Sequence, residues 1–149
     1  MSGDPVPPIL PDVDDPVTAP FWAGARAGKL LVQTCGACGT PRFPPRLFCG
    51  ACASAEVEWR ESGGQGKIWS WVLAHGPTLP AFAAHVPYPV IVVELDDFPR
   101  IRLVGNLVAT PDAAIDSVPA EAIAIGLPVT VCFRALDERV TLLFWTPGG

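Results

Sequence analysis

Residues 35–52 read CGACGTPRFPPRLFCGAC and hold four of the five cysteines of the chain, in the spacing C-x2-C-x10-C-x2-C. A Cys-x-x-Cys turn places two sulfurs on one side of a tight loop, and two such turns supply the four corners that a metal with sulfur bonds of about 2.3 Å requires. Glycine and alanine flank the cysteines, so that backbone N–H groups can approach the sulfurs. This segment therefore predicts a zinc ribbon whose ligands are Cys35, Cys38, Cys49 and Cys52.

Disulfide bonds and redox chemistry are the alternatives to a structural metal site. A disulfide needs an oxidising compartment, and a redox dithiol uses one Cys-x-x-Cys pair beside a βαβ pattern, whereas this segment carries two pairs. Four thiolates leave no open coordination position, so the metal would fold the segment and would not catalyse a reaction. Iron accepts the same four sulfurs. Zinc is favoured because nothing else in the chain indicates electron transfer, and iron, with an electron-carrier function, stays an alternative.

The composition is typical of a β-rich protein with a packed core. Half of the 149 residues are hydrophobic and 17% are charged, a balance that disordered chains do not show. The length suits one ordinary domain or two very small ones. The 14 glycines and 18 prolines indicate many turns and short elements, which favours strands over a helical bundle.

Charge and targeting signals limit the partners and the compartment. The net charge is −5, and the ten basic residues form no run, which disfavours nucleic acid as a partner. No apolar stretch approaches the roughly 18–20 residues of a membrane span. The first residues, MSGDPVPPILPDVDDP, contain no basic residue and no continuous apolar segment, unlike a secretory signal. We expect a cytoplasmic protein that does not contact membranes.

The chain before the cysteines divides into an arm and a short helix. Residues 1–17 contain five prolines and four aspartates but no lysine or arginine, and we expect a flexible, acidic, proline-rich arm there. Thr18 as an N-cap, Pro20 in the first turn and Gly28 as a stop signal predict the helix. With the ribbon it forms the second segment, residues 18–62.

Residues 63–149 are predicted to form a second unit, which begins at the turn sequence GGQG. LDER separates the last two of its strands as a hairpin loop, and the stretch before the fourth strand has room for short helical turns. This pattern favours a five-stranded OB-fold barrel, although SH3-like barrels and small sandwiches use a similar number of strands. The expected strands are KIWSWVLAH (67–75), YPVIVVEL (88–95), RIRLVGNLV (100–108), PVTVCFRAL (128–136) and RVTLLFWT (139–146).

Motifs of autonomous enzymes are absent from the sequence. It contains no Gly-x-Ser-x-Gly elbow, no Walker loop and no Gly-x-Gly-x-x-Gly that opens a helix. His75 closes a strand and His85 lies in a proline-flanked loop, and neither has a catalytic partner that the sequence reveals. We therefore expect no catalytic residues and a protein that is not catalytic alone.

The order of these segments resembles a known family. A helix with FW leads into LLVQTCGACGTPRFPPRLFCGAC, and IWSWVLAH, PYPVIVVEL and GLPVTVCFRAL follow. This arrangement resembles the acyl-CoA-associated family of bacteria and archaea that was long catalogued as a domain of unknown function. The resemblance covers about residues 18–147. It implies a mainly β protein with an N-terminal helix, a rubredoxin-like zinc ribbon and a C-terminal OB-fold.

The resemblance also implies an accessory role. Members of the family pair with thiolase-superfamily enzymes or with hydratases that handle CoA esters, and help to complete a site for CoA. One branch forms a retro-aldolase of steroid side-chain degradation with a thiolase-like lipid-transfer protein, and another belongs to acyltransferase complexes. The expected partner is therefore a thiolase-like subunit in a hetero-oligomer. A single-stranded nucleic-acid binder is the alternative, since OB-folds and zinc ribbons also serve that purpose.

Five residues are candidate contacts for CoA or for the partner subunit. Arg42 and Arg46 match basic positions of the loop between the cysteine pairs in that family, and His75 matches the histidine that ends the first barrel strand. Phe21 and Trp22, on the short helix, either fill the core of the protein or contact the partner.

Overall fold

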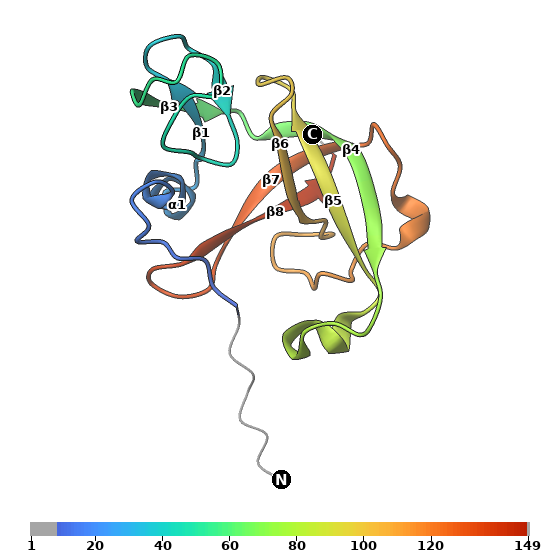
Figure 1. The fold of residues 1–149 in the computed structure, drawn as a ribbon. Coiled ribbons are helices and arrows are strands. Elements are labelled where there is room, and N and C mark those ends of the chain that lie inside the picture. The colour runs from blue at the N-terminus through green and yellow to red at the C-terminus, as the bar shows by residue number, and fades with distance from the viewer. Residues whose placement is uncertain (1–8, 149) are drawn as a thin grey trace.

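A computed structural model describes residues 9–148 and shows a mainly β fold with one short α-helix, in which a three-stranded sheet joins a five-stranded sheet (Figure 1). The predicted fold class is confirmed. Among the described residues, no helix has the length and apolar character that crossing a membrane requires. The elements are α1 (Ala19–Arg26), β1 (Leu30–Cys35), β2 (Pro41–Arg42), β3 (Val57–Ser62), β4 (Gln65–Ala74), η1 (Pro80–His85), β5 (Tyr88–Leu95), β6 (Arg102–Asn106), η2 (Ala120–Ala122), β7 (Pro128–Ala135) and β8 (Thr141–Pro147).

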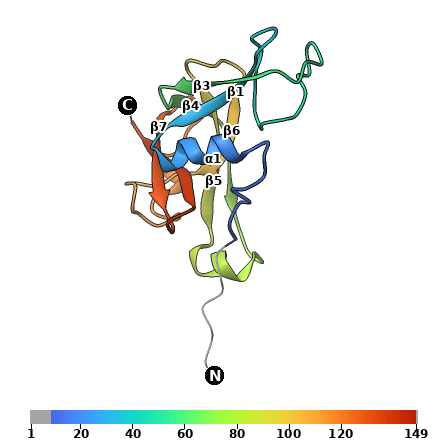
Figure 2. The same ribbon diagram turned by 90° about the vertical axis from the view of Figure 1, so that its left-hand side faces the viewer.

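Helix α1 packs against both sheets. It begins after Thr18 with Pro20 in its first turn, although the Thr18 side chain makes no capping hydrogen bond. The chain leaves the helix through Gly28, whose φ of +73° is left-handed backbone that glycine adopts without a steric penalty. Its buried side chains are Phe21 and Ala25. The helix lies beside β1 and across the side of the barrel that β8 and β7 form (Figure 2).

The smaller sheet has the order β2-β1-β3 and carries the cysteine segment. Strand β1 pairs antiparallel with β3 over its whole length, from Leu30 opposite Ser62 to Cys35 opposite Val57. Strand β2 has only two residues and was not predicted, because a proline-rich stretch of this length shows no alternation. Its pairing with β1 holds the loop between the two cysteine pairs against the sheet.

The larger sheet has the order β6-β5-β4-β7-β8 and closes into a barrel. Leu107 forms a parallel bridge with Trp145, and the N–H of Val108 donates to the carbonyl of Trp145 at 2.8 Å, which brings the β6 side of the sheet to β8. All five predicted strands are present. The third is shorter than predicted, because Arg100 has a φ of +73° and belongs to the turn that precedes it.

The core lies inside the barrel and extends under α1. Alternate side chains of β5 are buried, and Ile91 and Val93 are fully enclosed. Phe21 belongs to this core, while Trp22 packs against its edge. The other side chains of β5 are half-buried, so this strand alternates between a core face and an outer face.

A carboxylate joins the ribbon to the barrel where the chain passes from β3 to β4. Asp97, in the turn after β5, accepts hydrogen bonds from Ser62 Oγ at 2.8 Å and from the N–H of Gly63 at 2.7 Å. Gly64 follows with a φ of +76°. The sequence had marked this glycine-rich stretch as a boundary, and the exact division at residues 62 and 63 stays a prediction.

The predicted N-terminal arm is described only in part. Residues 1–8 lie outside the described residues. The remainder forms turns in which the carboxylates of Asp12 and Asp15 accept hydrogen bonds from nearby backbone N–H groups, and Asp14 pairs with Arg139 of the β7–β8 hairpin. This part of the arm therefore contacts the barrel.

Candidate metal centre

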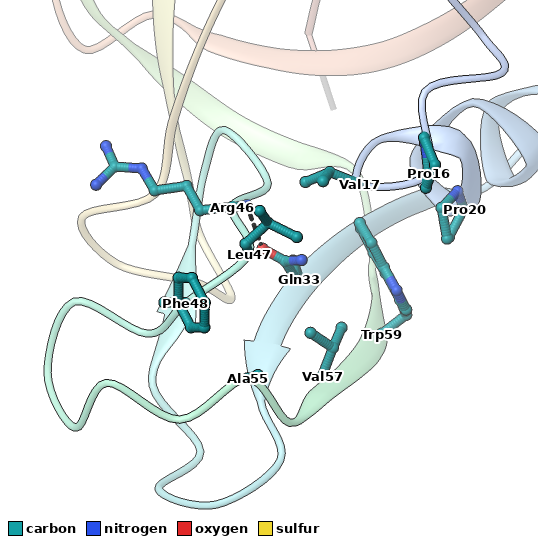
Figure 3. Close-up of a pocket in the computed structure, with 10 residues that line it drawn as sticks. All are labelled: Pro16, Val17, Pro20, Gln33, Arg46, Leu47, Phe48, Ala55, Val57 and Trp59. Atoms are coloured by element: carbon teal, nitrogen blue, oxygen red, sulfur yellow. Dashed lines mark hydrogen bonds between the residues drawn. The ribbon is translucent and has the colours of Figure 1, made fainter.

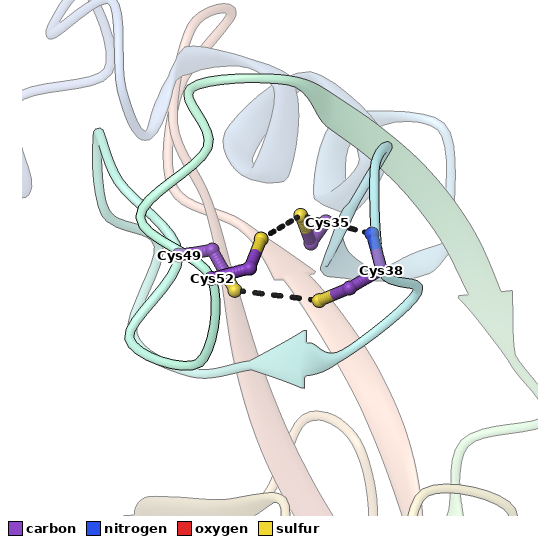
Figure 4. A group of neighbouring side chains, drawn as sticks. All are labelled: Cys35, Cys38, Cys49 and Cys52. Carbon is purple, nitrogen blue, oxygen red and sulfur yellow. Dashed lines mark hydrogen bonds between the residues drawn. The ribbon is translucent and has the colours of Figure 1, made fainter.

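The four predicted metal ligands converge (Figure 4). Their sulfur atoms all lie within 4.8 Å of one another, with Cys35 Sγ at 3.6 Å from Cys52 Sγ and Cys38 Sγ at 3.7 Å from Cys49 Sγ. A tetrahedron of zinc–sulfur bonds of about 2.3 Å has sulfur–sulfur edges of about 3.8 Å. These two sulfur pairs therefore have about the spacing of a tetrahedral edge, and the whole group is close enough to share one metal ion.

The two cysteine turns have the same backbone geometry. In the first, the N–H of Gly39 donates to the carbonyl of Cys35 at 2.8 Å; in the second, the N–H of Ala53 donates to the carbonyl of Cys49 at 2.9 Å. Both Gly39 and Ala53 have positive φ, at 76° and 63°. Backbone N–H groups also point at the sulfurs, from Cys38 to Cys35 Sγ and from Ala51 to Cys49 Sγ, each at 3.4 Å. Such donors stabilise thiolates, the form in which cysteine binds a metal.

The pKa values of the cysteine thiols indicate that the cluster favours a bound cation. The Thr40 hydroxyl and backbone lower the pKa of Cys38 to about 6. At Cys52 the backbone of Ser54 lowers the pKa, but hydrogen bonds with Cys35 and Cys38 outweigh it and raise the pKa to about 12. Thiols at this separation oppose one another's ionisation, because each negative charge raises the cost of the next.

The donor set fits a structural zinc ion. Four soft sulfur ligands in a tetrahedron suit Zn²⁺, and iron binds the same set. The metal would supply the positive charge that lets all four thiols ionise and would cross-link β1 to the segment before β3. Cys132, the fifth cysteine, lies in β7 outside this group, and its burial raises the pKa of its thiol.

The loop between the cysteine turns is held by a buried amide. Gln33 Oε1 accepts hydrogen bonds from Arg42 Nε and from the backbone N–H of Arg46, both at 2.7 Å. Arg42 Nη2 donates to the carbonyl of Arg46 at 3.2 Å. Arg42 is 9% exposed, and among the described residues its Nη1 has no hydrogen-bond partner. Arg42 thus braces the loop, while the side chain of Arg46 reaches solvent.

A groove opens between this loop and the residues that lead into α1; we call it the ribbon groove (Figure 3). Its volume is about 350 Å³. Gln33 forms part of its floor, and Arg46 stands at its rim with the guanidinium turned outward. Its apolar walls are formed by Val17, Pro20, Leu47, Phe48, Val57 and Trp59.

The other candidate contacts lie elsewhere. Phe21 and Trp22 meet edge to face with ring centroids 5.0 Å apart, and both line a second, smaller cleft of about 270 Å³ where β6 and β8 approach. His75 is exposed just beyond β4 and is not near the ribbon groove residues. His85 contacts Asp116 at 3.3 Å, a pairing across loops that the sequence could not reveal. The structure therefore brings Arg42 and Arg46 together. Phe21 and Trp22 line the second cleft with Phe43 of the same loop, and His75 lines neither cleft.

Two family profiles match consecutive parts of the chain. Residues 22–58 match the rubredoxin-like zinc ribbon domain of ChsH2, and residues 59–134 match the C-terminal OB-fold domain of ChsH2. The chain belongs to the ChsH2 family. The ribbon with its four converging cysteines and the barrel are thus both family features, and the resemblance noted from the sequence is confirmed.

Relatives and solved structures of the ChsH2 type cover most of this chain. The ChsH2(DUF35) structure solved as an Ltp2-ChsH2(DUF35) aldolase is 34% identical, with a TM-score of 0.75 over 92% of this chain and 98% of that chain. A probable enoyl-CoA hydratase alpha subunit of Thermomonospora curvata is 36% identical over 86% of this chain. The 3-oxo-4,17-pregnadiene-20-carboxyl-CoA hydratase alpha subunit of Mycobacterium tuberculosis is 31% identical over 87%. The chain spans 37% of the length of each of these two hydratase subunits.

Sequence reasoning missed two residues of this ChsH2-type chain that organise the site. Gln33 lies in β1, and its burial is visible only once β1 is paired on both sides. Asp97 lies in a turn, where an acidic residue is usually solvated, yet it accepts hydrogen bonds from Ser62 and Gly63 between the ribbon and the barrel. A polar residue within the buried strand LLVQTC was the one available signal for Gln33, because a buried amide requires partners.

Proposed function

We propose that this protein is a non-catalytic accessory subunit of a thiolase-superfamily enzyme that acts on acyl-CoA esters. The observation that carries this proposal is the likeness, from end to end, to the ChsH2 component of the Ltp2-ChsH2(DUF35) aldolase. The protein would pair with a thiolase-like, Ltp2-type subunit and help it to assemble and to bind CoA. The carbon–carbon bond chemistry would belong to that subunit.

Steroid side-chain degradation is the setting that we favour. One hydratase relative is named for a pregnadiene carboxyl-CoA, and the solved relative is an aldolase. Within the proposal, the four cysteines hold one structural zinc ion, the complex is cytoplasmic, and Arg46 and His75 are candidate contacts of the CoA ester or the partner. Arg42 would act by bracing the loop that presents Arg46.

A role as a hydratase subunit is the second candidate. Two relatives at 36% and 31% identity carry that description, but the matched part is 37% of each. The matched part contains the ribbon and the barrel. It therefore supports a shared accessory module more strongly than hydratase chemistry. The nucleic-acid alternative is not favoured by these relatives.

Co-expression tests the proposal. The chain is produced with the Ltp2-type protein of the same organism, and size-exclusion chromatography with activity assays compares the pair with each component. We expect a stable hetero-complex and retro-aldol cleavage of a β-hydroxyacyl-CoA that is at least ten-fold faster than with the Ltp2-type protein alone. An Ltp2-type protein that is equally soluble and active without this chain would remove the basis of the proposal. Faster hydration of an enoyl-CoA instead would favour the second candidate.

A further inference from the structure

The ribbon groove combines open apolar walls with a rigid floor. Leu47 and Phe48 are 64% and 61% exposed, and Val57 is 39% exposed. Side chains of this size are rarely left in water in adjacent positions unless they meet a partner. The loop that carries Leu47 and Phe48 is fixed at both ends by Cys38 and Cys49 and in its middle by the Arg42 bond to Gln33, and Val57 lies in β3. The apolar surface is thus pre-organised, which reduces the entropy cost of binding.

A hydrogen-bond donor of the largely buried Gln33 reaches the groove. Because Gln33 Oε1 accepts two N–H groups, the orientation of the amide is set, and its Nε2 must lie on the opposite side. Figure 3 shows this nitrogen turned away from Arg46, toward Trp59 and the open groove. Gln33 is 3% exposed, and no described residue accepts a hydrogen bond from Nε2. A carbonyl oxygen of a ligand in the groove could replace water as the acceptor for this donor.

The positive charge of Arg46 at the rim of the groove favours a ligand that also carries an anionic group. Among residues 9–148, Arg46 forms no ion pair, while Asp14, Glu61, Glu94 and Asp116 all have cationic partners. Its guanidinium is exposed at the rim, where an anionic group of a ligand can pair with it. Arginine and tryptophan are enriched at the energetic centres of protein interfaces, and Trp59 lies in the same groove.

From these three observations we propose that the ribbon groove is the docking surface for an apolar loop of the catalytic subunit. A backbone carbonyl of that loop would accept from Gln33 Nε2, and a carboxylate at its edge would pair with Arg46. The open walls favour a protein segment over a small molecule, because a small ligand would leave most of Leu47 and Phe48 in water. The inference rests on the proposed function, since it assigns the surface through which that partner binds.

The test measures the affinity of purified variants for the Ltp2-type protein by isothermal titration calorimetry. Phe48→Asp places a charge on the groove wall, and we expect the dissociation constant to rise at least about 30-fold. Ile125→Asp is the matched control, because Ile125 is 72% exposed on the barrel, outside the groove, and should change the affinity less than about two-fold. Both positions are exposed, so circular dichroism and metal content should equal those of the wild type.

Gln33→Glu tests the donor separately. It keeps an acceptor for Arg42 and Arg46 but removes the N–H groups that face the groove, and we expect the affinity for the Ltp2-type protein to fall about ten-fold.

An unchanged affinity for both Phe48→Asp and Gln33→Glu would overturn the inference while leaving the proposed function intact. Loss of affinity in Ile125→Asp alone would move the interface to the barrel. Wild-type protein that does not bind the Ltp2-type protein would refute the proposed function and this inference with it. Conversion of a self-associated form to a monomer by Phe48→Asp, with partner affinity retained, would assign the groove to a second copy.

Discussion

The ribbon and the barrel differ in what stabilises their folds. The barrel encloses a continuous apolar core to which β4, β5, β6, β7 and β8 all contribute. Between residues 33 and 67, the buried hydrophobic residues are Cys35 and Cys49, both of them metal ligands in our interpretation. The ribbon therefore has almost no apolar interior of its own.

This difference separates what each region can expose. Burial of apolar surface stabilises the barrel, so the side chains that form its core must face inward, while others, such as Val104, remain exposed. The ribbon would be held by metal–sulfur bonds, which leaves Leu47, Phe48 and Val57 free to face solvent. A metal-folded loop can thus present an apolar surface to a partner without losing its own stability.

Removal of the metal should have the largest effect, because it should unfold the ribbon and leave the barrel folded. Zinc binding by such sites contributes about 10–16 kcal/mol to folding, and the ribbon has little else to replace it. We expect chelation of the loaded protein to abolish amide protection in residues 33–60 and to leave β4–β8 protected, as measured by hydrogen exchange with metal analysis. Cys38→Ser should reproduce this loss, and Cys132→Ser, which lies in β7, should not. A ribbon that stays protected without metal would contradict the structural role.

Truncation of the barrel core should give the reverse pattern. Ile91 is 0% exposed, and Ile91→Ala should lower the free energy of unfolding by about 2–5 kcal/mol in urea denaturation, because it leaves a cavity. The control is Val104→Ala, since Val104 is 70% exposed on the neighbouring strand, and its effect should stay within about 0.5 kcal/mol. The affinity of the ribbon for zinc should remain that of the wild type in both variants. A large fall in zinc affinity in Ile91→Ala would show that the two regions do not fold independently.

The sequence predicted the two regions for different physical reasons. The ribbon was found from cysteine spacing, because the tetrahedron of a metal restricts which spacings are possible. The barrel was found from five apolar segments separated by turn sequences, such as YPVIVVEL, which forms β5. Both signals are local in the chain and therefore visible without the fold.

The remaining features depend on contacts between distant segments. The role of Gln33 requires the loop from β2 to fold back on β1, and the pairing of His85 with Asp116 joins two loops. Phe21 and Trp22 could be assigned to core or partner only when α1 had been placed against β8. From the sequence, Arg42 looked like an exposed cation in a proline-rich loop, yet its guanidinium donates hydrogen bonds to Gln33 Oε1 and to the carbonyl of Arg46. Composition and spacing do not contain this information.

Substitution of Asp97 at the junction between the two regions should have the smallest effect on the free energy of unfolding. Asp97 accepts from Ser62 Oγ and from the N–H of Gly63, so it binds the last residues of the ribbon sheet to the β5–β6 turn of the barrel. Asp97→Ala removes both bonds and should lower the free energy of unfolding by about 1 kcal/mol, because Asp97 is exposed and water replaces part of the loss. Asp97→Asn keeps one acceptor oxygen and should lose about half as much.

Hydrogen exchange distinguishes a junction from an ordinary surface contact. If Asp97 couples the regions, Asp97→Ala in the zinc-loaded protein should increase exchange at residues 60–65 while Cys35–Cys52 and the core of β5 stay protected. An increase spread evenly over the barrel would instead mean that Asp97 stabilises the turn after β5 and not the connection. The coupling also bears on function, because the groove lies on the ribbon and the core that anchors α1 lies in the barrel. A loosened junction should therefore weaken the affinity for the catalytic subunit less than Phe48→Asp does, since the groove itself would remain intact.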